Sequence, residues 1–464
     1  MVFPTVEFAI FFPIVLALSW ALMPWPRLWK PFILSASYVF YASASWKFCV
    51  LLALVTLANQ AAAVLVHRER ERPEVTRWIV AAIVAVDLGV LGVFKYYGFF
   101  IDEIGQVFDD IGLPLPLPVA TIALPVGISF FTFQAISYAV DVRRRLIDPA
   151  PVIDFALYLS YFPHLVAGPI VRAREFLPQL TRPRDWRDVS IGAGVLLIVI
   201  GLIKKVAIAD YLAREVVDPV FGVPETYYSP DVLLATYAYA AQIFCDFSGY
   251  TDMAIGLALL MGFVFPQNFD RPYRATSFRD FWRRWHITLS RYLRDFLYIP
   301  LGGNRGGRLF TARNLMLTML LGGLWHGANW TFVIWGGIHG ACLVGERVLA
   351  SRFSAPAWLR WLVVFHLVCL AWVMFRSPDL DVAGTFLSRL AEPGDATLWS
   401  VPVVAVVATV IGVQLLPTRP IDALRLRIAE LHPAVLGLAL GVTVLAVAAT
   451  VPSQGVPPFI YFRF

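Results

Sequence analysis

The sequence has few charged residues: Asp, Glu, Lys and Arg make up 15% of its 464 residues, against about 25% in ordinary soluble proteins. Hydrophobic residues make up 59% of the chain, and neither a hydrophilic domain nor a hydrophilic linker interrupts them. The apolar runs are long, unlike the weakly alternating segments of an outer-membrane barrel. Because one membrane-spanning helix needs roughly 20 apolar residues, the sequence predicts a single all-α polytopic membrane domain over residues 1–464.

Several common motifs are also absent. The sequence has no glycine-rich phosphate loop, no zinc signature and no Gly-x-Ser-x-Gly nucleophile elbow. Its four cysteines lie inside apolar runs, without the close pair that a metal site or a redox dithiol needs; they are Cys49, Cys245, Cys342 and Cys369. We expect neither a bound metal or cofactor nor a nucleic-acid partner. The expected surroundings of the chain are membrane lipids. No internal repeat is visible, which disfavours a transporter built from two matched halves.

The apolar runs predict where the chain crosses the membrane. Spans are expected near residues 6–23, 31–45, 47–66, 78–98, 119–141, 188–209, 232–264, 356–375, 400–416 and 433–451. The first run lacks a basic region before it and a cleavage site after it, so we expect a retained span rather than a signal peptide. The shorter runs at 152–170 and 314–346 are broken by Gly or Pro and predict half-helices or re-entrant segments beside a central cavity.

Basic residues are concentrated in a few loops. Residues 271–313 hold ten arginines against Asp280 and Asp295, a net charge of +8, so the rest of the chain carries about −2. Basic loops mark the cytoplasmic side of a membrane protein. The other basic loops lie near residues 27–30, 68–77, 143–145 and 419–427. This distribution predicts a cytoplasmic basic segment at 271–313 and both termini on the opposite, periplasmic side.

Two histidines are the main candidates for chemistry. His326 lies in the apolar stretch 315–330, and His286 lies in the run Phe-Trp-Arg-Arg-Trp-His. An ionisable group at membrane depth is costly and marks function more often than packing, although a lone histidine can also serve as a hydrogen-bonding strut between helices. Glycines around His326 permit a close backbone approach, and Trp325 and Asn329 flank it, which indicates a lined cavity. His339 would face elsewhere on a continuous helix and is expected to be structural.

Residues 278–299 have the pattern of one amphipathic helix. Aromatic and aliphatic residues recur at helical spacing on one face, with five arginines on the other: Arg279, Arg283, Arg284, Arg291 and Arg294. His286 falls at the edge of the apolar stripe. Such a helix can lie in the membrane interface as an anchor. The alternative is that these arginines also line the mouth of a tunnel and hold the phosphates of a cytoplasmic donor such as coenzyme A.

A third polar cluster, Cys-Asp-Phe-Ser-Gly-Tyr-Thr-Asp-Met, occupies residues 245–253. Asp246 and Asp252 lie six residues apart, and Tyr250 lies between them. The pattern fits a proton relay, an ion site or a capped helix break, and the residue types do not decide among these.

Six strings along the chain carry a family resemblance. They are Leu-Pro-Val-Gly-Ile-Ser-Phe-Phe-Thr-Phe-Gln (124–134), Phe-Pro-His-Leu-Val-Ala-Gly-Pro-Ile (162–170), Asp-Phe-Ser-Gly-Tyr-Thr-Asp-Met-Ala (246–254), Asn-Phe-Asp-Arg-Pro-Tyr (268–273), Phe-Arg-Asp-Phe-Trp-Arg-Arg-Trp-His-Ile (278–287) and Leu-Trp-His-Gly-Ala (324–328). In this order they resemble the motifs of membrane-bound O-acyltransferases, and more narrowly those of the bacterial alginate O-acetyltransferase branch. The ending at 458–464 is similar too, with Phe-Arg-Phe where that branch commonly has Phe-Gln-Phe.

This resemblance implies a ring of about 10–12 transmembrane helices, with re-entrant and interfacial helices, around a central tunnel. It implies that His326 is the catalytic histidine and His286 the second signature polar residue. A neutral imidazole can take the proton of an attacking hydroxyl, which typically contributes about 10²- to 10⁴-fold; transient acylation of the histidine is the alternative. We further expect these side chains to line the tunnel or hold the donor: Arg283, Arg284, Trp325, Asn329, Asp246 and Tyr250.

The expected function is therefore that of a bacterial inner-membrane O-acyltransferase. An acetyl group would pass from a cytoplasmic thioester, acetyl-CoA foremost, to an exported polysaccharide or peptidoglycan, directly or through a periplasmic SGNH-type partner. Two alternatives stay open at this point. The donor could be a carrier-protein thioester of the D-alanyl type, or the chain could be a polytopic transporter with a proton path through His326, Asp246 and Asp252.

Overall fold

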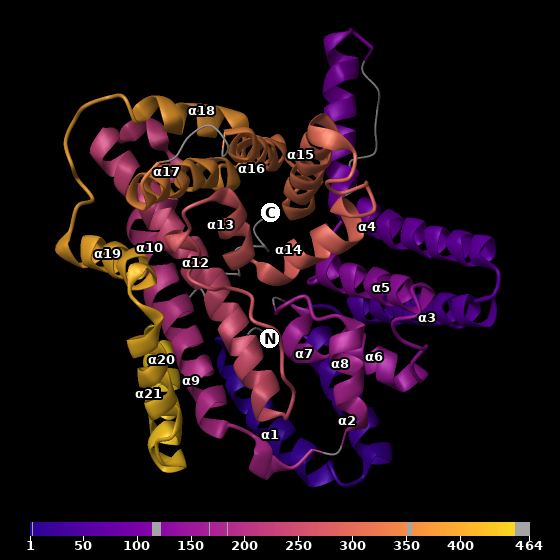
Figure 1. Ribbon diagram of the computed structural model, residues 1–464. Helices are drawn as coiled ribbons and strands as arrows, with labels where there is room; N and C mark the ends of the chain where they lie inside the picture. The colour runs from indigo at the N-terminus through magenta and orange to yellow at the C-terminus, as the bar shows by residue number, and fades with distance from the viewer. Residues whose placement is uncertain (2, 114–121, 167, 183, 350–354, 451–464) are drawn as a thin grey trace. The chain divides into compact units, whose positions relative to one another are not determined.

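The computed structural model describes residues 1, 3–113, 122–166, 168–182, 184–349 and 355–450, and the regular structure of these residues is helical throughout (Figure 1). Residues 119–121 and 451 of the predicted spans, residue 167 of one motif and the terminal string 458–464 lie outside this part of the chain. Two compact units are formed. The first contains Met1–Ser190 and Leu257–Phe265, and the second contains Ile191–Gly256 and the described residues from Pro266 onward.

The first unit contains eight α-helices within the described residues. They are α1 (Val6–Leu22), α2 (Pro26–Ala42), α3 (Trp46–Arg68), α4 (Pro73–Asp110), α5 (Ile128–Arg143), α6 (Val152–Ser160), α7 (Phe162–Leu165) and α8 (Ala173–Thr181). Helices α2 and α4 begin with proline, which suits the first helical turn because its N–H groups have no partner there. The predicted break within 152–170 is confirmed, because α6 and α7 are only 9 and 4 residues long.

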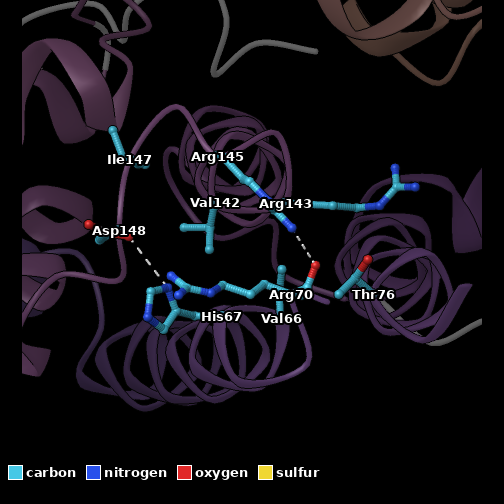
Figure 2. Close-up of a pocket in the computed structure, with 9 residues that line it drawn as sticks. All are labelled: Val66, His67, Arg70, Thr76, Val142, Arg143, Arg145, Ile147 and Asp148. Atoms are coloured by element: carbon cyan, nitrogen blue, oxygen red, sulfur yellow. Dashed lines mark hydrogen bonds and ion pairs between the residues drawn. The ribbon is translucent and has the colours of Figure 1, made fainter. Parts of the chain in front are cut away.

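The ends of α3 and α5 and the start of α4 meet around a small cavity of about 80 Å³. In Figure 2, Arg145 donates to the backbone carbonyl of Arg70, 2.7 Å away, and Nδ1 of His67 lies 3.4 Å from Oδ1 of Asp148. The basic loops near 68–77 and 143–145, which the sequence assigned to one side of the membrane, therefore lie together.

The second unit carries His286, His326 and the basic segment 271–313. Its α-helices are α9 (Ile191–Leu202), α10 (Asp210–Leu212), α11 (Asp218–Gly222), α12 (Ser229–Leu260, whose last turn belongs to the first unit), α13 (Phe278–Arg284), α14 (Ile287–Leu293), α15 (Gly307–His326), α16 (Trp330–Leu349), α17 (Ala357–Arg376), α18 (Leu380–Arg389), α19 (Val401–Leu415), α20 (Thr418–Ala429) and α21 (Pro433–Thr450). Wider π-helical turns at Ile203–Ala209 and Ala213–Val217 join α9 to α11, and a third at Arg294–Tyr298 follows α14.

Six helical segments of the described residues are long and apolar enough to cross a membrane: 46–68, 73–110, 191–222, 229–260, 330–349 and 357–376. The bent pair α19 and α20 could form a seventh, and α1 is a shorter apolar helix. The protein is thus a multi-pass membrane protein.

Helices α15 and α16 form an antiparallel hairpin. A Cβ atom placed on Gly323 would lie 2.2 Å from the carbonyl oxygen of Phe332, and one on Gly336 would lie 2.3 Å from that of Met319. Only glycine permits so close an approach of two backbones. The break at 327–329 agrees with the prediction, but each arm has 20 residues and α16 can span alone, so "half-helix" is wrong for α16.

Candidate active site

His286 interrupts the segment that the sequence pattern predicted as one amphipathic helix over 278–299. That prediction is wrong: α13 ends at Arg284, α14 begins at Ile287, and His286 has the left-handed backbone conformation with φ of 43°. The reason is local pairing with an earlier segment. The N–H of Asp270 donates to the carbonyl of Arg284, and the N–H of Ile287 donates to the carbonyl of Asn268, both at 2.9 Å. These bonds hold a conformation that costs a non-glycine residue about 1–3 kcal/mol.

The break places the His286 ring in the interior rather than at the edge of an interfacial helix. Its side chain is fully buried, 4.7 Å from the ring of Phe247 on α12 and 6.3 Å from that of Trp325 (ring centroids). Nδ1 lies 3.1 Å from the side-chain oxygen of Asn268. Burial lowers the pKa of His286 to about 3, because a charged ring would lose its hydration. The ring is therefore neutral at physiological pH.

His326 is the last residue of α15. It is 3% exposed, and its ring centroid lies 4.9 Å from Trp325, 5.1 Å from Trp335 and 5.2 Å from Phe375. Trp325 contacts both His286 and His326, so the structure brings the two predicted histidines together around one indole ring. The aromatic residues Trp335 and Phe375 were not anticipated, because they come from α16 and α17.

Asn329, three residues after His326, joins the turn between α15 and α16 to another segment. Its side-chain oxygen accepts from the N–H of Thr331 at the start of α16, and its amide donates to the carbonyl of Pro378, 2.6 Å away. These two bonds tie the hairpin turn to the segment after α17.

The expectation that His339 faces away from His326 is wrong. It assumed a continuous helix, whereas the chain reverses at 327–329 and α16 runs back along α15. Both histidines contact Trp335, with ring centroids 5.1 and 4.8 Å from it. His339 is fully buried among aromatic rings, including Phe281 and Trp282 of α13 at 5.9 and 5.1 Å.

A cavity of about 750 Å³ opens beside α13 and α14, and we call it the arginine-lined cavity. Its charged lining consists of Arg279, Arg283, Arg291, Arg294, Arg347 and Glu346. Its apolar lining includes Trp282, Ile287, Leu293, Leu315 and Met319. Of the described residues around it, neither His286 nor His326 is part of the lining, but Ile287 directly follows His286.

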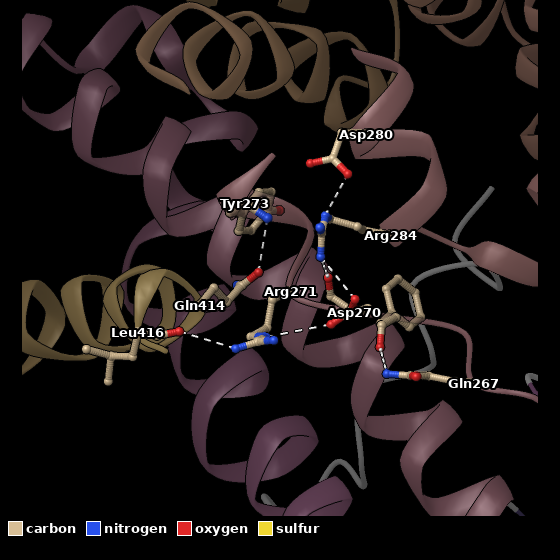
Figure 3. Close-up of polar contacts among 9 residues, drawn as sticks. Gln267, Asp270, Arg271, Tyr273, Asp280, Arg284, Gln414 and Leu416 are labelled. Carbon is tan, nitrogen blue, oxygen red and sulfur yellow. Dashed lines mark hydrogen bonds and ion pairs between the residues drawn. The ribbon is translucent and has the colours of Figure 1, made fainter. Parts of the chain in front are cut away.

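The two candidate donor-binding arginines occupy different places. Arg283 is exposed and lines the arginine-lined cavity. Arg284 instead pairs with Asp280 at 2.9 Å and with Asp270 at 3.0 Å (Figure 3). Because Asp270 belongs to the segment that pairs with the helix break, Arg284 helps to fix the surroundings of His286.

Asp246 and Tyr250 lie on α12, next to a pair of lysines that the sequence reasoning missed. Lys205 is buried and contacts Asp246 and Asp210, both at 2.7 Å, and its Nζ lies 5.9 Å from the ring centroid of Tyr250. Lys204 pairs with Asp252 at 2.6 Å. Two adjacent lysines inside the apolar run 188–209 were the signal that could have revealed these ion pairs. Among the described residues, no group of three His, Cys, Asp or Glu side chains could hold a metal ion.

Comparison with known proteins gives a consistent result. Residues 33–376 match the model of the membrane-bound O-acyltransferase family. The chain is 46% identical over 373 residues to the probable alginate O-acetylase AlgI of Azotobacter vinelandii, covering 79% of this chain and 73% of that protein. It is 37% identical over 392 residues to the peptidoglycan O-acetyltransferase of Helicobacter pylori, covering 77% and 72%. A teichoic acid D-alanyltransferase of Streptococcus thermophilus is 28% identical over 238 residues, covering 47% and 56%.

Proposed function

Because the chain belongs to the membrane-bound O-acyltransferase family, we propose that this enzyme transfers an acetyl group from a cytoplasmic thioester to a hydroxyl of a polysaccharide on the far side of the membrane. The names of its relatives support alginate or peptidoglycan as the acceptor class. Residence in the inner membrane and a periplasmic SGNH-type partner stay predictions from the sequence resemblance, and periplasmic termini stay a prediction from the distribution of basic loops.

The observation that carries this proposal is the arginine-lined cavity. Its volume of about 750 Å³ lies within the range of about 300–1,000 Å³ usual for small-molecule sites. Five arginines against one glutamate suit the phosphates of coenzyme A, which arginine binds in a bidentate manner. The apolar lining suits the uncharged arm that leads to the thioester. Ile287, which lines this cavity, directly follows His286 in the chain.

The reaction needs a proton acceptor near the thioester carbonyl. A neutral imidazole takes the proton of the attacking hydroxyl while the hydroxyl oxygen forms a bond to the carbonyl carbon. The C–S bond then breaks, and the proton passes to the thiolate, so that an ester and a free thiol are formed. We assign the proton transfer to His326 and an assisting role to His286; acylation of His326 itself is the alternative route.

The test uses the purified protein in lipid nanodiscs, supplied with acetyl-CoA and an oligosaccharide acceptor. Thiol release and ester formation are expected from the wild-type protein and not from His326→Ala, although this variant should insert into membranes normally. Wild-type turnover in His326→Ala would refute the assignment.

The donor is identified by binding of coenzyme A, measured by calorimetry. Arg283→Ala should weaken binding about 10-fold, in keeping with about 1.5 kcal/mol for a charge-assisted hydrogen bond. Arg308→Ala is the matched control, because Arg308 is exposed in the same basic segment but does not line the cavity. If coenzyme A does not bind and only a thioester-loaded carrier protein is used, the D-alanyl type of donor replaces our assignment.

A further inference from the structure

The side-chain oxygen of Asn268 is the meeting point of three polar groups around His286. It lies 3.1 Å from the backbone nitrogen of Thr288, 2.9 Å from the Thr288 hydroxyl and 3.1 Å from Nδ1 of His286. The side chains of Asn268 and His286 are both fully buried, so bulk water does not compete for these bonds.

This geometry determines which nitrogen of His286 carries the hydrogen. A backbone N–H can only donate, so the Asn268 atom that faces the Thr288 nitrogen must be the amide oxygen and not the NH₂ group. An amide oxygen can only accept. Nδ1 of His286 must therefore donate, and in a neutral ring the other nitrogen, Nε2, then has the lone pair.

The surroundings of the ring do not oppose this state. Phe247, Phe269 and Trp325, from three different segments, pack against it and carry no charge. The charged residues of the two paired segments, Arg284 and Asp270, bind each other. Nε2 is buried and makes no hydrogen bond within the described part of the chain, so these residues do not use its lone pair.

We propose that Asn268 is a positioning residue that holds His286 with its hydrogen on Nδ1, so that His286 accepts a hydrogen bond at Nε2 from a hydroxyl of the acceptor. The same tautomer excludes a role for His286 as a hydrogen-bond donor to the oxyanion. Stabilising the oxyanion of the tetrahedral intermediate requires a donor, and neutral His286 has no hydrogen on Nε2. This inference rests on the proposed function and gives the assisting role of His286 a definite chemical form.

Two variants and a control separate this role from simple packing. Asn268→Asp places a carboxylate against Nδ1, which favours the charged ring and removes the lone pair from Nε2. Its kcat should fall at neutral pH and recover as pH rises, with the midpoint of this limb at a higher pH than that of the limb that the proton acceptor His326 gives the wild-type profile. Asn268→Ala removes the acceptor that keeps the hydrogen of His286 on Nδ1. It should lower kcat by about 10- to 100-fold, as the loss of an outer-shell hydrogen-bond partner does at metal sites. Thr288→Val removes only the hydroxyl contact and keeps the backbone donor, so its pH profile should match the wild type.

The tautomer is also measured without catalysis, by ¹⁵N NMR of histidine-labelled protein, with His286→Gln used to assign the signal. A hydrogen on Nδ1 in the wild-type protein is expected, with loss of this preference in Asn268→Ala. A hydrogen on Nε2, or an unchanged pH profile in Asn268→Asp, would overturn the inference. Absence of any acetyl transfer in the wild-type protein would instead refute the proposed function and leave the NMR result standing.

Discussion

Replacing Gly336 with alanine is expected to separate α15 from α16 and to reduce both stability and activity. The new Cβ atom would lie 2.3 Å from the carbonyl oxygen and 3.0 Å from the carbonyl carbon of Met319, whereas ordinary contact begins at 3.4 Å. The two backbones must therefore move apart by about 1 Å, because a close-packed interior has no free space to absorb the methyl group. Overpacking of this kind costs about 1–3 kcal/mol, more than the roughly 0.8–1 kcal/mol that alanine gains over glycine in a helix.

The same movement should affect catalysis. Gly336 directly follows Trp335, whose ring packs against His326, so a shift of α16 displaces one wall of the candidate site. A misplacement of about 1 Å can lower the rate by about 10²-fold. Gly337→Ala is the matched control, because its Cβ would meet only the end of the Leu320 side chain, at 3.6 Å.

Thermal unfolding in nanodiscs and acetyl transfer from acetyl-CoA measure the two effects. Gly336→Ala should unfold several degrees below the wild-type protein and turn over far more slowly, whereas Gly337→Ala should match or exceed wild-type stability. Wild-type behaviour of Gly336→Ala, or equal damage from both substitutions, would refute the argument from backbone contact.

Two further predictions concern buried ionisable groups. Lys205→Met leaves Asp210 and Asp246 together in the interior and should lower the free energy of unfolding by about 3–5 kcal/mol. Lys204→Met should lower it less, because the Lys204 side chain is 20% exposed. Urea unfolding that ranks the two variants in the opposite order would contradict this prediction. His286 has a folded pKa of about 3, below its value of about 6.5 in the unfolded chain, so the unfolded state binds the extra proton and stability falls as pH drops through 6.5 toward 3. The loss attributable to His286 between pH 7 and pH 5 is about 2 kcal/mol, and the measured difference between those pH values should shrink by that amount in His286→Gln.

The helix positions were largely predictable because apolar length is a local property of the sequence. Helices α3, α4 and α12 begin within five residues of the predicted spans, and the glycines at 322–327 marked the turn of the α15–α16 hairpin. The prediction of one helix over 278–299 failed because the spacing of apolar residues gives no information about backbone pairing with another segment. The backbone of 284–287 bonds with 268–270, and a partner segment outside the helical window leaves no trace in the spacing of apolar residues.

The candidate site was predictable in its residue types but not in its contacts. His286 and His326 were recognisable as ionisable groups in an apolar chain, and the structure places Trp325 in contact with both. Asn268 was visible only as part of a familiar string, because its role depends on which atom faces Thr288. The position of His339 was missed for a similar reason, since angular arithmetic along a helix does not apply after the chain reverses direction.

The ten arginines of 271–313 show why net charge alone could not locate a binding surface. In the sequence, Arg283 and Arg284 are neighbours on the polar face of one predicted helix. In the structure, Arg284 pairs with Asp270 and Asp280. Its charge is therefore balanced by carboxylates of the protein, one of which belongs to the segment 268–270 that carries Asn268. Arg283 remains exposed at the arginine-lined cavity. Only part of the +8 charge therefore faces that cavity, while Arg284 helps to hold the backbone break at His286. The composition of the basic segment does not separate these two uses of its arginines.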